Sequence, residues 1–486
     1  MKQKLFQISA VDDVAVVLSA LTANETYGEI PFAHKVALRD IRKGETIVKY
    51  GYPIGHAIEE IKRGEHVHSH NLKTNLSGYQ EYVYRPNHRE MKPRKEDLFF
   101  QGYLRQDGRA GTRNDVWIIP TVGCVAHMAN KLAEEAEKRF PGRVDHILAL
   151  GHNTGCSQMG EDQERTMRIL AGLAANPNAG GVLLLSLGCE NNHLDIFKPY
   201  LADIPQEKLR FLVAQDADDE WETALSLLDE LTAYAKSFRR SNLPADKLTI
   251  GLKCGGSDAL SGVTANALCG RFSDALCSCG GTAIMTEVPE MFGAEHLLME
   301  RAISEDVFHD IVRLINDYKD YFLRHHQVIY ENPSPGNKAG GITTLEEKSL
   351  GCVQKSGTSP VNGVLGYGQY VERAGLHLLT GSGNDEVSST NLAASGATLI
   401  CFTTGRGNPF GAPVPTIKIS SNTPLATRKP HWIDFDAGRV LDDESVKDVD
   451  RRFMEYILTT ASGEVLTNNE KHGYQSISVF RDGVIL

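Results

Sequence analysis

From about residue 100 onward, the sequence repeats one arrangement: a short apolar run, a glycine-bearing loop and an amphipathic stretch. Apolar runs begin three such units at residues 116–119, 146–150 and 181–187, and a further run at residues 209–214 precedes a helical pattern at residues 220–238. Alternation of strand and helix indicates parallel strands, because a parallel neighbour needs a crossover connection that covers the sheet. We therefore predict an α/β protein with mostly parallel sheets.

The first part of the chain has a different sequence pattern. Residues 1–88 hold short alternating runs separated by turn signals, which predicts a small β-rich domain. Residues 89–100 are charged and include proline, as is typical of a linker. We divide the α/β part of the chain into a first domain at residues 101–247 and a second α/β region, with the C-terminal domain, at residues 248–486. A chain of 486 residues is too long for one core, which agrees with several domains.

Composition narrows the range of partners. The formal net charge of -11 argues against a nucleic-acid surface. No run of about 18 uncharged apolar residues occurs, so we expect no membrane-spanning segment. Asp12 and Asp13 interrupt the apolar part of the N-terminus, which therefore does not resemble a secretory signal. We expect a cytoplasmic protein that binds a small anionic molecule. Assembly into a homo-oligomer stays open at this point.

The cysteines follow a pattern. Nine of them are spread along the chain, which does not suit a disulfide framework and favours a reducing compartment. Four of the nine follow predicted strands directly: Cys124, Cys156, Cys189 and Cys254. Strand ends of a parallel sheet meet at the ligand crevice, so these thiols are expected to converge there. The alternative for each one is a small buried apolar residue.

Residues 254–295 combine several reactive groups. CGGSD at residues 254–258 lies where a strand passes into a helix, and its glycines let backbone N–H groups approach an anion. A second apolar run at residues 281–286 leads to Glu287 and Glu290. The segment therefore supplies a thiol, an anion cradle and two carboxylates. The alternative is a strand–turn–helix unit whose glycines serve packing.

Basic side chains gather in three further stretches. His66, His68 and His70 alternate, so on an extended segment they share one face and could converge on a metal or flank a substrate. Lys338 lies in a loop rich in proline and glycine, and Arg406 lies between two glycines at a predicted strand end. Both suit the binding of a carboxylate. A solvated loop and surface positions are the alternatives.

Nine longer motifs are spread along the chain: EHVHSHN (65–71), TVGCV (121–125), TGCSQ (154–158), LGCEN (187–191), CGGSD with SGVTAN (254–266), TEVPEMFGAE (286–295), NPSPGNKAGG (332–341), TTGRG (403–407) and HWIDFDAG (431–438). Through these motifs the chain resembles the altronate/galactarate family of sugar-acid dehydratases over essentially its whole length. The first 88 residues are similar to the SAF-type domain of this family. The His66-x-His68 pair and TEVPEMFGAE look like its altronate branch.

This resemblance implies a hydro-lyase of hexuronate catabolism that converts D-altronate to 2-dehydro-3-deoxy-D-gluconate, with Fe²⁺ as activator or Mn²⁺ in its place. A divalent ion on the carboxylate and 2-hydroxyl stabilises the enediolate that forms when the C2 proton leaves. A base takes that proton, and an acid protonates the departing C3 hydroxyl. Three alternatives stay open: a galactarate dehydratase, a sulfolactate-type lyase, and a non-catalytic regulator that binds sugar acids.

Side chains are assigned to these roles as hypotheses. The predicted metal ligands are Cys156, Cys189, Cys254 and His152. The predicted catalytic groups are His66, His68 and Glu287, with His68 preferred as base or acid and Glu287 also eligible as a ligand. The predicted substrate-binding residues are Ser257, Asp258, Lys338 and Arg406. In the less favoured arrangement, three of the four strand-end cysteines hold an iron–sulfur cluster.

Overall fold

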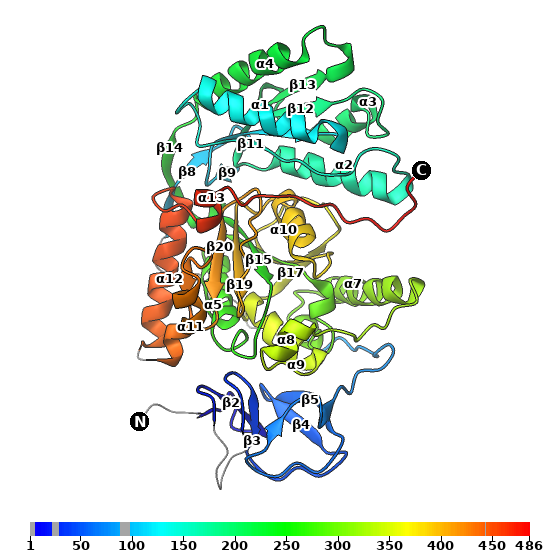
Figure 1. Cartoon of the computed structure of the whole chain (residues 1–486), viewed down its shortest axis with the longest axis vertical. Coiled ribbons are helices and arrows are strands. Elements are labelled where there is room, and N and C mark those ends of the chain that lie inside the picture. Colours follow the sequence, from blue (N-terminus) through cyan, green and yellow to red (C-terminus); the bar gives the residue numbers. More distant parts are fainter. Residues whose placement is uncertain (1–4, 22–28, 88–97, 443) are drawn as a thin grey trace.

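The computed structural model describes residues 5–21, 29–87, 98–442 and 444–486. Its three parts are stacked along the long axis, with the N-terminal β-rich part at one end, the four-stranded sheet at the other and the C-terminal sheet between them (Figure 1). Most of the predicted linker at residues 89–100 lies outside the described residues. No helix of the described part is long and apolar enough to cross a membrane.

Two small antiparallel sheets form the N-terminal part, as the alternating runs predict. The first has the order β1 (Leu5–Phe6), β2 (Val14–Val17), β3 (Lys35–Ala37) and β6 (His66–Val67). The second has the order β4 (Thr46–Lys49), β5 (Tyr52–Ala57) and β7 (Leu72–Lys73). Val36 pairs with His66, so the His-rich segment lies beside β3.

A parallel sheet of four strands forms the part nearest the opposite end. Its order is β11 (Ile147–Ala149), β10 (Asp115–Pro120), β12 (Ala179–Ser186) and β13 (Leu209–Val213). Helices α1 (Ala126–Arg139) and α4 (Glu220–Ala235) pack on one face, where Val116 and Ile118 point. Helix α2 (Gly160–Ala175) packs on the other face with Trp117 and Ile119. Strands covered on both faces are apolar throughout, which explains the continuous runs in the sequence.

Two smaller elements complete this part. The short helix α3 (Leu194–Phe197) follows β12. A three-stranded sheet of β14 (Arg240–Pro244), β8 (Phe99–Leu104) and β9 (Ala110–Gly111) lies where the chain enters and leaves the four-stranded part.

The largest sheet has seven parallel strands. Their order is β17 (Val361–Leu365), β18 (Gly375–Leu379), β16 (Thr282–Met285), β15 (Thr249–Cys254), β19 (Leu399–Thr404), β20 (Thr416–Ser420) and β21 (Phe435–Asp436). Its helices are α5 (Ala265–Ser278), α6 (His296–Met299), α7 (Glu305–Arg324), α8 (Pro335–Ala339), α9 (Leu345–Cys352), α10 (Asp385–Ala394), α11 (Thr423–Arg428), α12 (Val446–Ala461) and α13 (Asn468–His472). The predicted α/β class with parallel sheets is confirmed.

The N-terminal part docks onto the C-terminal part through α8 and α9. Glu347 of α9 pairs with Lys35 at 2.8 Å and with Lys49 at 2.7 Å, and all three side chains are at most 1% exposed. Gly341 has φ 91°, and a Cβ there would lie 2.5 Å from the carbonyl oxygen of Ala33. The loop after α8 therefore needs glycine to approach the N-terminal backbone this closely.

Candidate functional site

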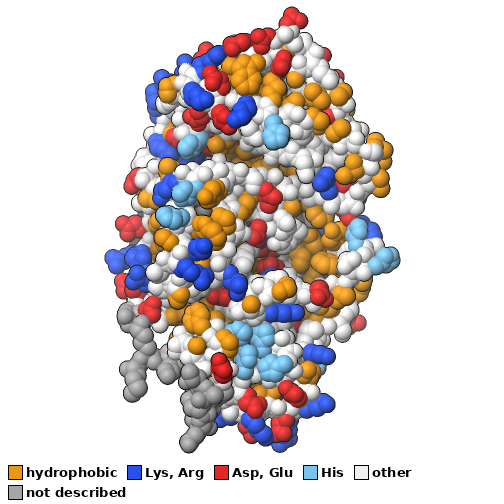
Figure 2. Space-filling model, viewed as in Figure 1, with side chains coloured by type: hydrophobic (Ala, Val, Ile, Leu, Met, Phe, Trp, Pro, Cys, Tyr) orange, Lys and Arg blue, Asp and Glu red, His pale blue; other side chains and the backbone are white. Residues whose placement is uncertain are grey.

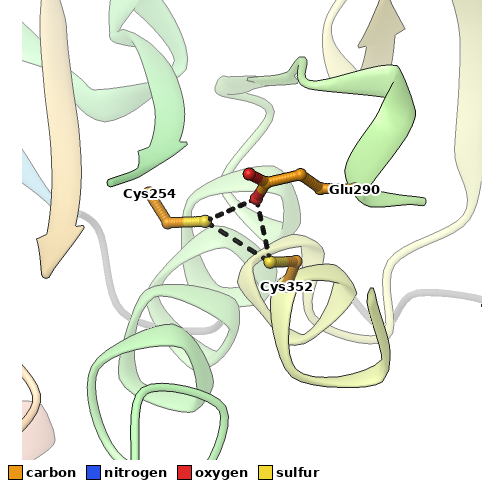
Figure 3. Close-up of side chains that lie close together, drawn as sticks. All are labelled: Cys254, Glu290 and Cys352. Carbon is orange, nitrogen blue, oxygen red and sulfur yellow. Dashed lines mark hydrogen bonds between the residues drawn. The ribbon is translucent and has the colours of Figure 1, made fainter. Parts of the chain in front are cut away.

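Two thiols and one carboxylate meet beneath the carboxyl ends of β15 and β16. The sulfur of Cys254, at the end of β15, and that of Cys352, at the end of α9, each lie 3.1 Å from Oε2 of Glu290 and 3.4 Å from each other (Figure 3). All three residues are buried. Within the described part of the chain, no other three side chains of His, Cys, Asp or Glu bring their donor atoms within 4.8 Å of one another.

Glu290 presents a charged carboxylate to the two sulfur atoms. Its Oε1 accepts a hydrogen bond from Lys348, with Nζ at 2.7 Å. Burial raises the pKa of this carboxyl, but the ammonium groups of Lys348, Lys253 and Lys355 outweigh burial and bring the pKa below its usual value. The site therefore holds an anion at neutral pH.

Glu287 supports the site by binding the backbone of Cys254. Its Oε2 accepts hydrogen bonds from the backbone N–H of Cys254 at 3.0 Å and from Lys355 at 2.7 Å, and its Oε1 contacts Lys253. Lys253 also pairs with Asp385 at 2.9 Å. Glu287 has φ 73°, a left-handed conformation that costs a non-glycine residue about 1–2 kcal/mol and that the fully paired side chain holds in place.

The charges around the two thiols suit a divalent cation. The ion pairs just described contain three carboxylates and three ammonium groups, which balance while both thiols are protonated. Loss of both thiol protons leaves a net charge of about -2, which one divalent ion cancels. Thiolate and carboxylate donors bind iron and other thiophilic divalent ions. The residues present therefore fit such an ion.

Histidines of the N-terminal part converge, as the alternating spacing predicts. The ring centroid of His66 lies 5.4 Å from those of His68 and His70. A fourth ring, His34, lies 5.0 Å from both His66 and His68. This cluster forms the pale-blue patch low on the visible face of the molecule (Figure 2).

Hydrogen bonds assign the protons of two of these rings. Nε2 of His34 lies 3.4 Å from the carbonyl oxygen of Ala339, which can only accept, so this nitrogen carries the hydrogen. Nδ1 of His34 then accepts from Nε2 of His66 at 2.9 Å, which leaves Nδ1 of His66 with a lone pair. Burial, with the neighbouring rings, lowers the pKa of His66 to about 3, so it is a neutral base at pH 7.

His68 is anchored to α8. Its Nε2 donates to the carbonyl oxygen of Lys338 at 2.9 Å, and its Nδ1 lies 3.0 Å from the hydroxyl of Ser69. Burial, followed by the charge of Lys35, lowers the pKa of His68 to about 4. Both ring nitrogens of His68 are thus occupied, whereas His66 has one free.

The predicted substrate-binding residues surround α8. Asn337 donates its side-chain N–H to the carbonyl oxygen of Ser257 at 2.9 Å, and a Cβ at Gly336 would lie 3.9 Å from Nε of Arg406. Arg406 is exposed and Lys338 is half-buried. Neither cation pairs with an acidic side chain in the described residues. Both are therefore available to an anionic ligand.

Asp258 has a different environment. It is buried, and its carboxylate accepts hydrogen bonds from Ser261 at 2.8 Å, Ser421 at 2.8 Å and Asn422 at 3.0 Å. A Cβ at Gly405 would lie 2.3 Å from its carboxyl carbon. In this structure Asp258 braces the CGGSD loop against the loop that carries Arg406.

The predicted metal ligands are divided between two sheets. Cys156, Cys189 and His152 follow strands of the four-stranded sheet, whereas Cys254 follows β15 of the seven-stranded sheet. His152 uses both ring nitrogens within its own loop, donating to the Pro120 carbonyl at 2.7 Å and accepting from the Thr154 hydroxyl at 2.8 Å. The structure therefore does not assemble the predicted set, and Cys254 meets Glu290 and Cys352 instead.

The residues predicted for the site did not include Cys352 or the three lysines around Glu287 and Glu290. A weak signal exists for Cys352, because Ser-Leu-Gly-Cys occurs both at residues 186–189 and at residues 349–352. The second copy ends a helix, however, and not a strand. The strand-end rule therefore did not detect it.

Three family profiles match successive parts of the chain. They are Altronate/galactarate dehydratase SAF domain at residues 3–75, D-galactarate dehydratase/Altronate hydrolase, second domain at residues 102–236, and D-galactarate/Altronate dehydratase, C-terminal at residues 245–485. Their order agrees with the three parts of the fold.

Characterised relatives match over nearly the full length. Altronate dehydratase of Bacillus subtilis (strain 168) is 51% identical, with 95% of this chain and 93% of the relative covered. Altronate dehydratase of Escherichia coli (strain K12) is 44% identical, with 99% of both chains covered. Galactarate dehydratase (L-threo-forming) of Escherichia coli (strain K12) is 33% identical, with 98% and 96% covered. The chain therefore belongs to the D-galactarate/altronate dehydratase family of hydro-lyases.

Proposed function

We propose that this protein dehydrates D-altronate to 2-dehydro-3-deoxy-D-gluconate, with Fe²⁺ held by Cys254, Glu290 and Cys352. The observation that carries the proposal is the buried group of two thiols and a carboxylate. Cys352 ends α9, the helix that follows α8, and the neutral histidines and the cations Arg406 and Lys338 lie at α8. Altronate is preferred over galactarate as substrate because the two most similar relatives described above are altronate dehydratases. Mn²⁺ is the alternative ion, since the carboxylate also suits it.

The N-terminal histidines supply the proton transfers. Nδ1 of His66 has a lone pair and a neutral ring, so it can accept the C2 proton of the substrate. His68 is neutral at pH 7 and both its ring nitrogens are hydrogen-bonded, so it is proposed to position the histidines on α8, while the proton that His66 takes from C2 passes to the C3 hydroxyl, which leaves as water. The resulting enol then tautomerises to the 2-keto acid. His34 sets the tautomer of His66 through its own hydrogen bond to Ala339.

The C-terminal part holds the substrate. Arg406 and Lys338 lie beside α8 without acidic partners, and they would bind the carboxylate of the sugar acid. The bound ion supplies Lewis-acid stabilisation of the negative charge that develops on the carboxylate and the 2-hydroxyl. Lys348 favours the charged form of Glu290, and Lys355 pairs with Glu287 at 2.7 Å, which keeps the donor set ready for the cation.

An anaerobic assay of the Fe²⁺-loaded protein against a panel of hexonates and hexarates tests this proposal. We expect 2-keto-3-deoxy product from D-altronate first, and a loss of about 10²–10⁴-fold in kcat for His66→Gln. His56→Gln is a matched control, because His56 contacts only Asn75 among the hydrogen bonds of its ring. Normal turnover by His68→Gln would show that His68 is not needed to position the site.

The same assay separates the alternatives. Faster turnover of galactarate, or of sulfolactate added to the panel, would move the chain to another branch of the family. Binding of sugar acids without any turnover would favour a regulator. None of the nine cysteines forms a disulfide in the structure, which agrees with a reducing cytoplasm as the proposed place of action. Assembly into a homo-oligomer stays a prediction that a size measurement in solution would check.

A further inference from the structure

Cys254 and Cys352 bring two sulfur atoms into contact inside the protein. The atoms lie 3.4 Å apart, and each residue is 1% exposed. Cys254 ends β15 and Cys352 ends α9, so the contact is made by tertiary packing and not by local sequence. A disulfide bond is about 2.0 Å long, so an approach of roughly 1.4 Å separates this contact from a bond.

The charges around the pair suit a disulfide as well as an ion. The three carboxylates and three ammonium groups of the site balance one another while the sulfur atoms carry no charge. Two thiolates without an ion would leave an excess of about -2 in a buried place. A disulfide is neutral, so the site without an ion can hold it with no unbalanced charge.

Only a small oxidant has room beside the pair. A cavity of about 10 Å³, which is room for about one water molecule, is lined by Cys352 together with Tyr50, Ser257 and Lys348. A peptide such as glutathione is much larger than this cavity. Hydrogen peroxide is close to water in size, so a peroxide is the class of oxidant that the site favours.

We propose that a peroxide joins Cys254 and Cys352 in a reversible disulfide when the site holds no ion, and that this bond switches the site off. The sulfur of Cys352, which lines the cavity, attacks one peroxide oxygen. The O–O bond breaks, and a sulfenic acid and one water molecule form.

The second step closes the bond. The sulfur of Cys254 attacks the sulfenic sulfur, the S–S bond forms and the S–O bond breaks. The hydroxyl leaves with the remaining thiol proton as a second water molecule. Two thiols are thereby oxidised by two electrons, and one hydrogen peroxide is reduced to two water molecules.

This switch deepens the proposed function and rests on it for the ion. The disulfide removes two of the three proposed ligands and leaves Glu290 alone. A bound ion occupies both sulfur atoms, so the loaded site should resist peroxide. A thiol reductant restores the two thiols and with them the capacity to bind the ion.

Mass spectrometry of the full-length wild-type protein tests the bond without any variant. The protein is freed of metal with a chelator, reduced, treated with hydrogen peroxide, blocked with iodoacetamide and digested with trypsin without reductant. Trypsin releases Cys254 in residues 254–271 and Cys352 in residues 349–355. We expect these two peptides to be joined, with fragmentation assigning the bond to Cys254, and to separate in dithiothreitol. Recovery of both cysteines as alkylated thiols would overturn the inference.

Cys269→Ser is the matched control, because Cys269 lies on the same tryptic peptide as Cys254. This variant should keep the joined peptides, whereas Cys254→Ser should lose them and carry a dimedone adduct on Cys352, which is the trapped sulfenic acid. A bond that disappears in Cys269→Ser and persists in Cys254→Ser would contradict the assignment.

Zn²⁺ separates the switch from the proposed function, because it binds thiolates and has no redox chemistry of its own. Protein loaded with Zn²⁺ should keep both thiols after the same peroxide treatment, and oxidised protein should bind Zn²⁺ only after reduction. A bond that forms equally fast with Zn²⁺ present would contradict the ion site and leave the bond standing. Metal-free protein that forms no bond and still binds Zn²⁺ after peroxide would overturn the switch and leave the ion site standing.

Discussion

Glu347 is the strongest single connection between the N-terminal part and the seven-stranded part. Its two carboxylate oxygens face Lys35 at 2.8 Å and Lys49 at 2.7 Å, and solvent reaches none of the three side chains appreciably. The change Glu347→Gln keeps the shape of the side chain and removes its charge. Two buried ammonium groups would then share one neutral amide.

Two estimates of the cost agree. Burial raises the pKa of Glu347, but the charges of Lys35 and Lys49 overcome burial and lower the pKa from 4.5 to about 2. At about 1.4 kcal/mol for each pKa unit, this fall corresponds to about 3 kcal/mol of stability at neutral pH. Removal of one partner from a buried ion pair costs about 3–5 kcal/mol in general. We therefore expect a loss of about 3 kcal/mol.

The sign of the pH dependence follows from the same group. Because the folded-state pKa lies below the unfolded value, the stabilisation is complete above pH 4.5 and is lost as the pH falls towards 2. In the variant the lysines lack their counter-ion, so high pH, which neutralises them, should reduce the deficit. Burial already lowers the pKa of Lys35 to about 8 in the wild type.

Hydrogen–deuterium exchange of peptides from residues 29–75 measures the effect locally, because a chain of several domains does not unfold in one step. A loss of about 3 kcal/mol corresponds to exchange that is roughly 100-fold faster where opening limits it. Glu45→Gln is the matched control, since Glu45 and its partner Arg39 are 36% and 43% exposed and an exposed pair contributes little to stability. Equal exchange in the two variants would refute the reasoning.

Three further predictions concern other parts of the chain. Gly341→Ala should lower the melting temperature far more than Gly142→Ala, because both have positive φ but only the first would place its Cβ 2.5 Å from a backbone oxygen of the N-terminal part. Arg406→Ala and Lys338→Ala should each raise KM for D-altronate without a change in melting temperature, and an unchanged KM would remove them from the substrate site. Lys418→Met should stabilise the protein at pH 6, because Nζ of Lys418 is buried without a hydrogen-bond partner and burial lowers its pKa to about 7. That advantage should shrink as the pH rises through 7 towards 10.5, since the wild-type lysine then loses its proton; denaturation curves at several pH values check this.

The local elements of the fold followed from the sequence because their causes are local. Apolar runs such as residues 116–119 became buried strands, since both faces of each parallel sheet are covered. The rings of His66, His68 and His70 lie together, as the spacing in EHVHSHN predicts, but only His66–Val67 is a strand, and the turn that follows it brings the other two rings to His66. The glycine-bearing loop after residue 254 lies at a strand end for the same kind of reason, because glycine permits the sharp change of direction.

The composition of the site was decided only by tertiary structure. Four cysteines follow strands in the same local pattern, yet strand order assigns Cys124, Cys156 and Cys189 to one sheet and Cys254 to another. Cys352 reaches Cys254 from a helix that lies 98 positions away, and His34 reaches His66 because β3 pairs with β6. Local spacing carries no information on which strands become neighbours, since that choice minimises the free energy of packing over the whole chain.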